Sequence, residues 1–222
     1  MLPIFVSTGV DGDNHPFHIT SKKASVQLEY PKCSGTYIGD SIQSFYEARK
    51  EIAQLTQRGY GTSWCLDPIR HRGAPISKGG TANGIMQPAA GVVQDMKEVS
   101  QGNSRRGSIG QYLNVLHPDF DELCDQIVAD DDGWNIGWNM TDEYKHMFVT
   151  DQERADHIWK RVLKTKMVKG KGYLWFMDKV NRARPQMYKD KGMFVRQSNL
   201  CSEIIISDNL VTKFIEIWVQ YV

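Results

Sequence analysis

Residues 196–204 read RQSNLCSEI and set a thiol (Cys201) between a carboxamide (Asn199) and a carboxylate (Glu203). If this segment is extended, the alternation of side chains along a strand places all three groups on one face. Such a face suits chemistry on a polyol, where a sulfur takes part in bond breaking while a base and an amide meet hydroxyls. The alternative is a small buried cysteine in a polar turn, because cysteine is among the most often buried residues.

Composition is that of an ordinary globular protein. The 222 residues fit one domain, or one and a fraction, with 41% hydrophobic and 24% charged residues. A net charge of +1 gives no reason to expect a nucleic-acid or membrane-surface partner. No apolar run approaches the length of about 18 residues that crosses a bilayer, and residues 1–10 lack the pattern of a secretory signal. We therefore expect a cytoplasmic protein.

The cysteines predict neither a metal site nor a disulfide framework. They stand at positions 33, 65, 124 and 201, without any C-x-x-C spacing. We expect no metal in this chain and a reducing compartment. The acidic run at 130–132 is interpreted as a solvated helix end, with a cation site as the alternative.

Strands that alternate with helices predict an α/β fold with mostly parallel pairing. Alternation indicates a strand at 25–30, and helical spacing indicates helices over 40–59 and 87–99, the first capped by Asp40. Glycines suggest that residues 58–75 are irregular. Further strands are expected at 112–116, 135–140, 173–177 and 193–198. Further helices are expected with Pro118 at the first position (and Cys124 in the core), with Thr141 as a cap, and with Asp151 at the start. Neither G-x-G-x-x-G, nor a P-loop, nor G-x-S-x-G occurs.

The stretch 196–204 resembles the finger-loop motif of the large, catalytic subunit of class I ribonucleotide reductase. In that family the cysteine becomes a thiyl radical that abstracts the ribose 3′ hydrogen, the glutamate acts as a base, and the asparagine helps to hold the ribose hydroxyls. The resemblance therefore implies that Cys201 is the radical carrier, Glu203 the base and Asn199 a substrate holder. It also implies that Ser198 belongs to the substrate site.

Other motifs resemble the same family in the same order, over residues 2–204. Cys33 resembles one of the two thiols that reduce the substrate. The stretch around Asp40 and the stretch RHRGAPI (residues 70–76) resemble parts that bind a dNTP effector. Residues 100–107, SQGNSRRG, resemble the loop that relays effector identity to the substrate. The implied effector-binding residues are Asp40, Ser41, Arg70, Gln101, Arg105 and Arg106.

The resemblance implies that residues 1–204 are the first half of a ten-stranded α/β barrel that reduces ribonucleoside diphosphates to deoxyribonucleotides. It implies a dNTP or ATP effector, a radical supplied by a small metal-containing subunit, and no organic cofactor in this chain. Thioredoxin or glutaredoxin is the implied reductant, and the full enzyme is expected to be a homodimer. The partner thiol of Cys33 is expected in a C-terminal half of the large subunit, so we expect residues 1–222 alone to be inactive.

Residues 205–222 are expected to be a tail outside the family pattern. They suit either translation into an intervening sequence or an extension on one half of a split protein. Two other functions are open: a non-catalytic half-barrel that docks with a complementary chain, and a dNTP-binding module that keeps only the effector site.

Overall fold

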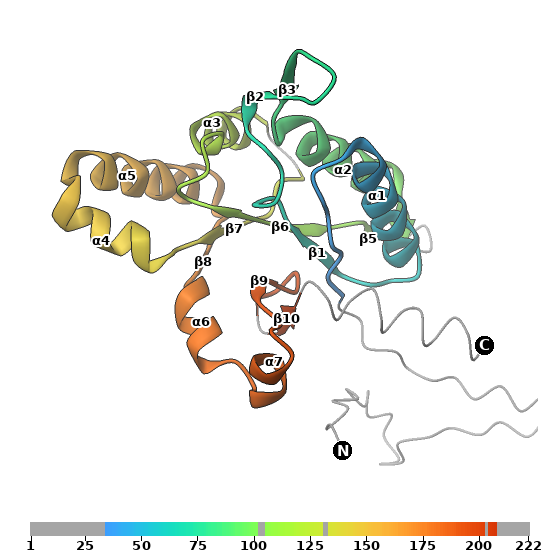
Figure 1. Cartoon of the computed structure of the whole chain (residues 1–222). Coiled ribbons are helices and arrows are strands. Elements are labelled where there is room, and N and C mark those ends of the chain that lie inside the picture. The colour runs from blue at the N-terminus through green and yellow to red at the C-terminus, as the bar shows by residue number, and fades with distance from the viewer. Residues whose placement is uncertain (1–33, 102–104, 131–132, 203, 208–222) are drawn as a thin grey trace, which may run out of the picture. The chain divides into compact units, whose positions relative to one another are not determined.

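The structure is a computed structural model that describes residues 34–101, 105–130, 133–202 and 204–207 (Figure 1). The chain divides into two compact units, residues 1–32 and 33–222, and every described residue belongs to the second. The strand predicted at 25–30 and the candidate residues Cys33 and Glu203 lie outside the described residues.

A parallel sheet forms the centre of this unit, in the order β1–β6–β7–β8. Its strands are β1 (Thr62–Cys65), β6 (Ile109–Asn114), β7 (Ile136–Asn139) and β8 (Tyr173–Trp175). Beyond β1, the N–H of Ser34 donates to Gly61 O (2.9 Å), and the N–H of Thr36 donates to Ser63 O (2.7 Å). Ser63 N in turn donates to Ser34 O (3.1 Å), which is the parallel pattern. Together with the four strands, residues 34–36 make five parallel segments side by side.

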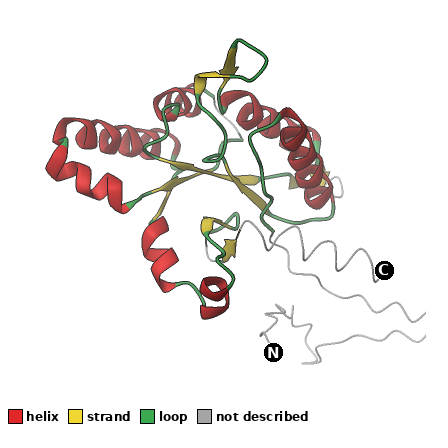
Figure 2. Cartoon of the chain, in the orientation of Figure 1, coloured by secondary structure: helices red, strands yellow, loops and turns green. Residues whose placement is uncertain are grey.

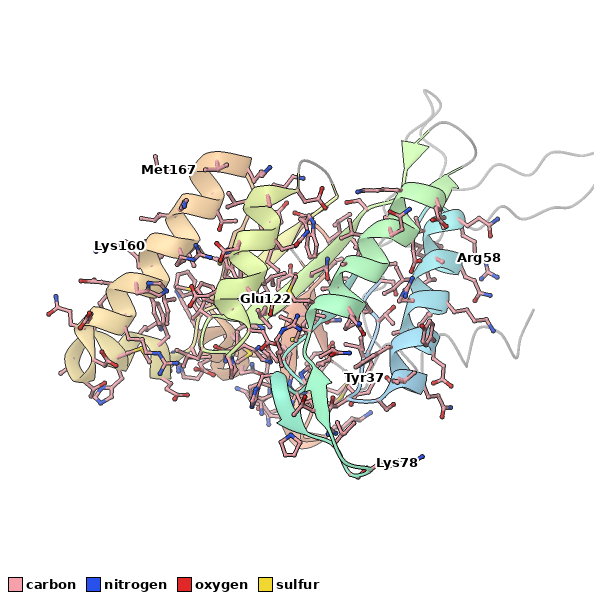
Figure 3. All side chains as sticks on the ribbon, turned by 90° about the horizontal axis from the view of Figure 1, so that it is seen from above. Tyr37, Arg58, Lys78, Glu122, Lys160 and Met167 are labelled. Carbon is pink, nitrogen blue, oxygen red and sulfur yellow. The ribbon has the colours of Figure 1, made fainter. Side chains whose placement is uncertain are left out.

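Helices cover one face of the sheet (Figure 2). They are α1 (Ile42–Gln57), α2 (Met86–Glu98), α3 (Phe120–Ala129) and α5 (Gln152–Lys169), with α4 (Asp142–Thr150) beside α5. Seen from above in Figure 3, they lie in the order α1, α2, α3, α5. This order follows that of the strands, because each crossover returns the chain from the carboxyl end of one parallel strand to the amino end of the next. None of the described helices combines the length and apolar character needed to cross a membrane.

Alternation along the strands divides their side chains between two apolar cores. Trp64, Leu113 and Trp138 belong to the core between the sheet and the helices, and all three are fully buried. Burying a side chain such as Leu113 stabilises the fold by roughly 1.5–3 kcal/mol. The second core lies on the opposite face and includes Tyr112 and Trp175, whose rings meet edge to face at 6.0 Å.

The last described part of the chain covers the face opposite to the helices (Figure 1). It consists of α6 (Met177–Ala183), α7 (Gln186–Asp190) and the antiparallel pair β9 (Val195–Ser198) and β10 (Ile205–Ser207). Asn181 joins α6 to β9 because its Nδ2 donates to Val195 O (2.7 Å) and its Oδ1 accepts from Val195 N (2.9 Å).

Two short hairpins complete the described elements. β2 (Arg72–Pro75) pairs with β3 (Thr81–Asn83), and Figure 3 shows Lys78 at the tip of this hairpin, pointing away from the helices. β4 (Ser100–Gln101) pairs with β5 (Arg105–Arg106) between α2 and β6.

The α/β class and the parallel pairing predicted from the sequence are confirmed. Thr141 and Asp151 cap α4 and α5, because their side chains accept hydrogen bonds from Tyr144 N and Arg154 N. Cys124 is buried in the core, as its place on the apolar side of α3 predicts.

Several local predictions are wrong. β8 ends at Trp175, so Met177 lies in α6 rather than in a strand, and α3 begins at Phe120, two residues after Pro118.

β1 lies within the stretch expected to be irregular; its four residues are all buried, so no alternation of apolar and polar residues marks it. Ser41, rather than Asp40, caps α1, since the Ser41 hydroxyl accepts from Ser44 N (3.1 Å). The Asp40 carboxylate is engaged by Arg70 instead.

Candidate active site

The chain around Cys201 forms a closed loop between β9 and β10. At its base the N–H of Asn199 donates to Ile204 O (3.3 Å), and the Ser198 hydroxyl donates to the same carbonyl (2.7 Å). In return, Ile204 N donates to Asn199 Oδ1 (3.0 Å). These bonds join the two ends of the loop, so residues 200–202 form its tip.

The extended geometry expected for residues 196–204 is wrong beyond Ser198. Ser202 N donates to Asn199 O (3.1 Å), and Ser202 has a φ angle of 68°, in the left-handed region. Asn199 is fully buried, whereas Cys201 is exposed. Because the chain turns here, strand alternation does not place these two side chains on one face. The exposure of Cys201 also contradicts the alternative of a buried core cysteine.

Two hydroxyl groups of the sheet hold this loop. Tyr112 OH on β6 donates to Asn199 O (2.9 Å) and lies 2.7 Å from Ser202 Oγ. Ser63 Oγ on β1 donates to Ser198 O (2.5 Å). Hydrogen bonds of this kind stabilise a protein by about 0.5–1.5 kcal/mol each, and a buried carbonyl that loses its donor costs more.

Two glycines of the sheet leave room for the backbone of the loop and for the Tyr112 ring. A Cβ atom on Gly110 would lie 3.3 Å from Leu200 Cα, within the backbone of the loop. A Cβ atom on Gly137 would lie 2.3 Å from Tyr112 Cε1. The absence of side chains at these two positions therefore makes room for the tip of the loop and for the ring that supports it.

A buried polar cluster lies at the carboxyl ends of β1, β6 and β7. Asp67 Oδ1 accepts from Asn114 N (2.5 Å), and Asp67 Oδ2 accepts from Asn139 Nδ2 (3.0 Å). Asn139 Nδ2 also donates to Arg196 O on β9 (2.9 Å) and lies 3.7 Å from Cys65 Sγ. Burial raises the pKa of the Asp67 carboxyl, and the hydrogen bonds from Asn114, Asn139 and Cys65 oppose that rise.

Two of the candidate effector residues meet in the structure. Arg70 Nε donates to Asp40 Oδ2 (2.6 Å), and Arg70 N donates to Asp40 Oδ1 (3.2 Å). A further bond from Arg70 Nη1 to Pro75 O (3.0 Å) ties the guanidinium to β2. Ser41 lies beside this pair as the cap of α1. The ion pair is partly exposed, at a point where a ligand from solvent can reach it.

The other candidate effector residues lie on β4 and β5. Gln101 pairs with Arg105, and Ser100 pairs with Arg106, in an antiparallel arrangement. The structure describes their backbone but not their side chains, and residues 102–104 at the turn lie outside the described residues.

Asp119 anchors both ends of the β2–β3 hairpin. Its Oδ1 accepts from Arg72 N (2.9 Å), and its Oδ2 accepts from Ile85 N (3.1 Å). Gly84 has a φ angle of 73°, and a Cβ atom there would lie 2.2 Å from Asp119 Oδ2. One buried carboxylate therefore fixes the hairpin that follows Arg70.

A separate cavity of about 270 Å³ opens at the amino ends of β6 and β7. Its lining residues are Val93, Met96, Lys97, Gly107, Ser108, Gly133, Asn135 and Lys171. Among the residues that the structure describes, no group of three or more His, Cys, Asp or Glu side chains could hold a metal ion.

The sequence pattern identified the loop but not its supports. Ser198, Asn199 and Cys201 are brought together by the closed loop, while Asp40 and Arg70 form a distinct pair on the loops that follow the first two parallel segments. The supports that sequence reasoning missed are Ser63, Asp67, Tyr112 and Asn139. The available signal covers only Tyr112 and Asn139, which are polar side chains within predicted strands; Ser63 and Asp67 lie in the stretch expected to be irregular.

Residues 32–133 and 133–212 match the family described as the ribonucleotide reductase barrel domain. The chain belongs to this family.

A relative from Frog virus 3 (isolate Goorha) is 29% identical over 194 residues, which are 78% of this chain and 33% of that protein. A vitamin B12-dependent ribonucleoside-diphosphate reductase of Mycobacterium tuberculosis (strain CDC 1551 / Oshkosh) is 28% identical over 195 residues, 75% of this chain and 26% of that protein. Among solved structures, the class Id ribonucleotide reductase alpha subunit of Actinobacillus ureae matches with a TM-score of 0.70 and 29% identity. That match covers 79% of this chain and 33% of the other. The chain thus spans a third or less of the length of these relatives.

Proposed function

We propose that this chain is the part of a ribonucleoside-diphosphate reductase large subunit that carries the radical cysteine. The observation that supports this most is the placement of Cys201. Its thiol is exposed at the tip of a loop whose base is buried against a parallel α/β sheet. An exposed sulfur on a rigidly held backbone suits a group that must meet both a substrate and a radical donor.

In the proposed reaction a thiyl radical on Cys201 takes the 3′ hydrogen atom of the ribose. Glu203 accepts the proton of the 3′-hydroxyl as the radical forms, which lowers the barrier. A thiol of a pair that includes Cys33 gives the proton with which the 2′-hydroxyl leaves as water. The pair then supplies two electrons and its second proton to C2′ and closes to a disulfide, and Glu203 returns its proton to the 3′ oxygen. The Cys201 thiol finally returns a hydrogen atom to C3′. Ser198 and Asn199 are the proposed substrate-side residues of the same loop.

The proposed partners are those that the family resemblance implies. The radical would come from a small metal-containing subunit; the name of the mycobacterial relative points to vitamin B12 as the competing source. The disulfide would be reduced by thioredoxin or glutaredoxin in the cytoplasm. The partner thiol would lie in the C-terminal half of the large subunit, and the full enzyme would be a homodimer controlled by ATP and dNTP effectors.

Substrate protection of Cys201 tests this proposal without requiring turnover. The full chain is treated with an alkylating reagent, with and without CDP, ADP, GDP or UDP, and Cys201 modification is measured by peptide mass spectrometry. We expect at least one diphosphate to slow the alkylation, while pyrophosphate protects less because it lacks the ribose. Cys124 is buried and serves as an internal control for unfolding. Equal alkylation in the presence of every diphosphate would contradict the proposal.

A dNTP-binding module is the second candidate function. It is favoured by the meeting of Asp40 and Arg70, which are 30 residues apart in the chain and 2.6 Å apart in the structure. Its test is a thermal melt with dTTP and dATP: a shift that disappears in Arg70→Ala would support an effector site, and no shift with either nucleotide would count against it.

A further inference from the structure

The cluster of Asp67, Asn139 and Cys65 has no part in the proposed chemistry, yet it meets the strand that carries the Cys201 loop. Asn139 on β7 is fully buried, and its Nδ2 reaches Asp67 Oδ2 (3.0 Å) and Arg196 O (2.9 Å). Arg196 lies on β9, two residues before Ser198. A single carboxamide therefore connects the carboxyl end of the sheet to the strand from which the loop begins.

The partners of Asn139 decide which way its carboxamide points. Both close oxygens, on Asp67 and Arg196, are acceptors, so the amide must direct its N–H₂ group toward them. With the opposite orientation, Asn139 Oδ1 would face two acceptors. In the observed orientation, Oδ1 is buried without a hydrogen-bond partner among the described residues. Leaving this oxygen unpaired costs free energy, and the two hydrogen bonds that Asn139 Nδ2 donates offset that cost. These two bonds therefore fix the orientation of the carboxamide.

The Asp67 carboxylate is the group that makes this orientation favourable. Its Oδ1 already accepts from Asn114 N (2.5 Å), so Oδ2 is the oxygen that faces Asn139. A protonated or amidated Asp67 would present a donor to Asn139 instead. The carboxamide would then satisfy that donor with Oδ1, and no N–H would reach Arg196 O.

We propose that Asp67 and Asn139 are positioning residues for the Cys201 loop: the Asp67 carboxylate orients the Asn139 carboxamide, which holds β9 by its hydrogen bond to the Arg196 carbonyl. The inference depends on the proposed function only for the role of Cys201. The bridge itself is a property of the fold and is tested without nucleotide.

The bridge responds to pH with a defined sign. Burial raises the pKa of Asp67 above its ordinary value of 3.8, so the carboxyl gains its proton at a higher pH than a solvated aspartate does. The titratable groups that face it are Cys65 from β1 and His117 from the segment after β6, and both lower its pKa. As the pH falls through the raised pKa of Asp67, the bridge to Arg196 is lost and the loop loosens.

Amide hydrogen exchange on the full chain, read by peptide mass spectrometry, tests the bridge. Asn139→Ala removes the carboxamide, and Asp67→Asn keeps the shape of the side chain while replacing the acceptor by a donor. We expect both variants to speed exchange of the amides in residues 196–202 by about tenfold, the effect of losing a buried hydrogen bond. Amides in α1 and α2 should exchange at the wild-type rate. Cys65→Ala keeps both oxygens of the bridge but removes a thiol that faces Asp67 and Asn139, so it should speed exchange at residues 196–202 less than Asn139→Ala does and leave α1 and α2 at the wild-type rate.

The pH profile separates positioning from a merely structural role. In the wild type, protection of residues 196–202, corrected for intrinsic exchange, should fall with decreasing pH around a midpoint above 3.8. In Asp67→Asn this step should be absent. Unchanged exchange at residues 196–202 in both variants would overturn the proposal, as would equal acceleration in the loop and in α1 and α2. If these exchange results hold but no diphosphate protects Cys201, the proposed function fails and the bridge stands.

Discussion

Among single residues, Tyr112 holds the loop most directly, because its hydroxyl contacts both Asn199 O and Ser202 Oγ. Removing this hydroxyl is the first prediction. Tyr112→Phe keeps the ring against Gly137 but leaves Asn199 O without this donor. We expect the free energy of unfolding to fall by about 1–2 kcal/mol, measured by urea denaturation. Tyr188→Phe is the matched control, because Tyr188 OH meets Ile205 O only at 3.5 Å, and it should cost much less. Equal losses in the two variants would show that the Tyr112 hydroxyl does not hold the loop.

Glu51 on α1 gives a prediction about pH at the same scale. Burial raises the pKa of its carboxyl from 4.5 to about 7. The folded state therefore holds this proton more tightly than the unfolded chain does, and stability is lost as the pH rises from about 4.5 through about 7. We expect Glu51→Gln to flatten this part of the curve of melting temperature against pH. Glu153→Gln, at an exposed position on α5, should leave the wild-type curve unchanged. A wild-type slope that persists in Glu51→Gln would rule out Glu51 as its cause.

At the scale of elements, the helices and most strands follow from local pattern, and the exceptions have physical reasons. Helical spacing and polar caps act within a few residues, so α4 and α5 and their caps at Thr141 and Asp151 could be predicted. β1 could not, because a short strand buried on both faces carries no alternation and is defined by its neighbours in the sheet. The turn at Asn199–Ser202 was missed for a similar reason. Its geometry depends on hydrogen bonds to Tyr112, which lies 87 residues earlier in the chain than Asn199.

The β2–β3 hairpin yields the element-scale prediction. Its two ends are fixed by the Asp119 carboxylate, which accepts from Arg72 N and Ile85 N. Asp119→Ala leaves these donors unpaired, so we expect the hairpin to open more often and trypsin to cleave after Lys78, at its tip, several-fold faster. Glu122→Gln weakens only the exposed ion pair with Arg72, at 2.6 Å, and should change the cleavage rate little. Equal cleavage rates in wild type and Asp119→Ala would show that the carboxylate does not restrain the hairpin.

At the scale of the whole molecule, the candidate site is assembled from segments far apart in the sequence. Ser198, Asn199 and Cys201 could be identified because they are contiguous in one motif. Ser63, which binds the carbonyl of Ser198, is 135 residues away, and Asn139 reaches Arg196 across 57 residues. A single sequence holds no signal for such pairs. They become visible only when parallel pairing brings the strands β1, β6 and β7 under the loop.

The outer edge of the sheet provides the last prediction. Within the described residues, β8 ends the strand order and pairs only with β7. Leu174 on this strand is 38% exposed, and an exposed apolar edge invites pairing with another chain. We therefore expect the 222-residue chain to self-associate as its concentration rises, and Leu174→Lys to reduce this association in sedimentation velocity. Leu163→Lys adds the same charge at an equally exposed leucine (38%) on α5, away from the sheet edge. If both substitutions reduce association equally, net charge rather than the β8 edge controls it.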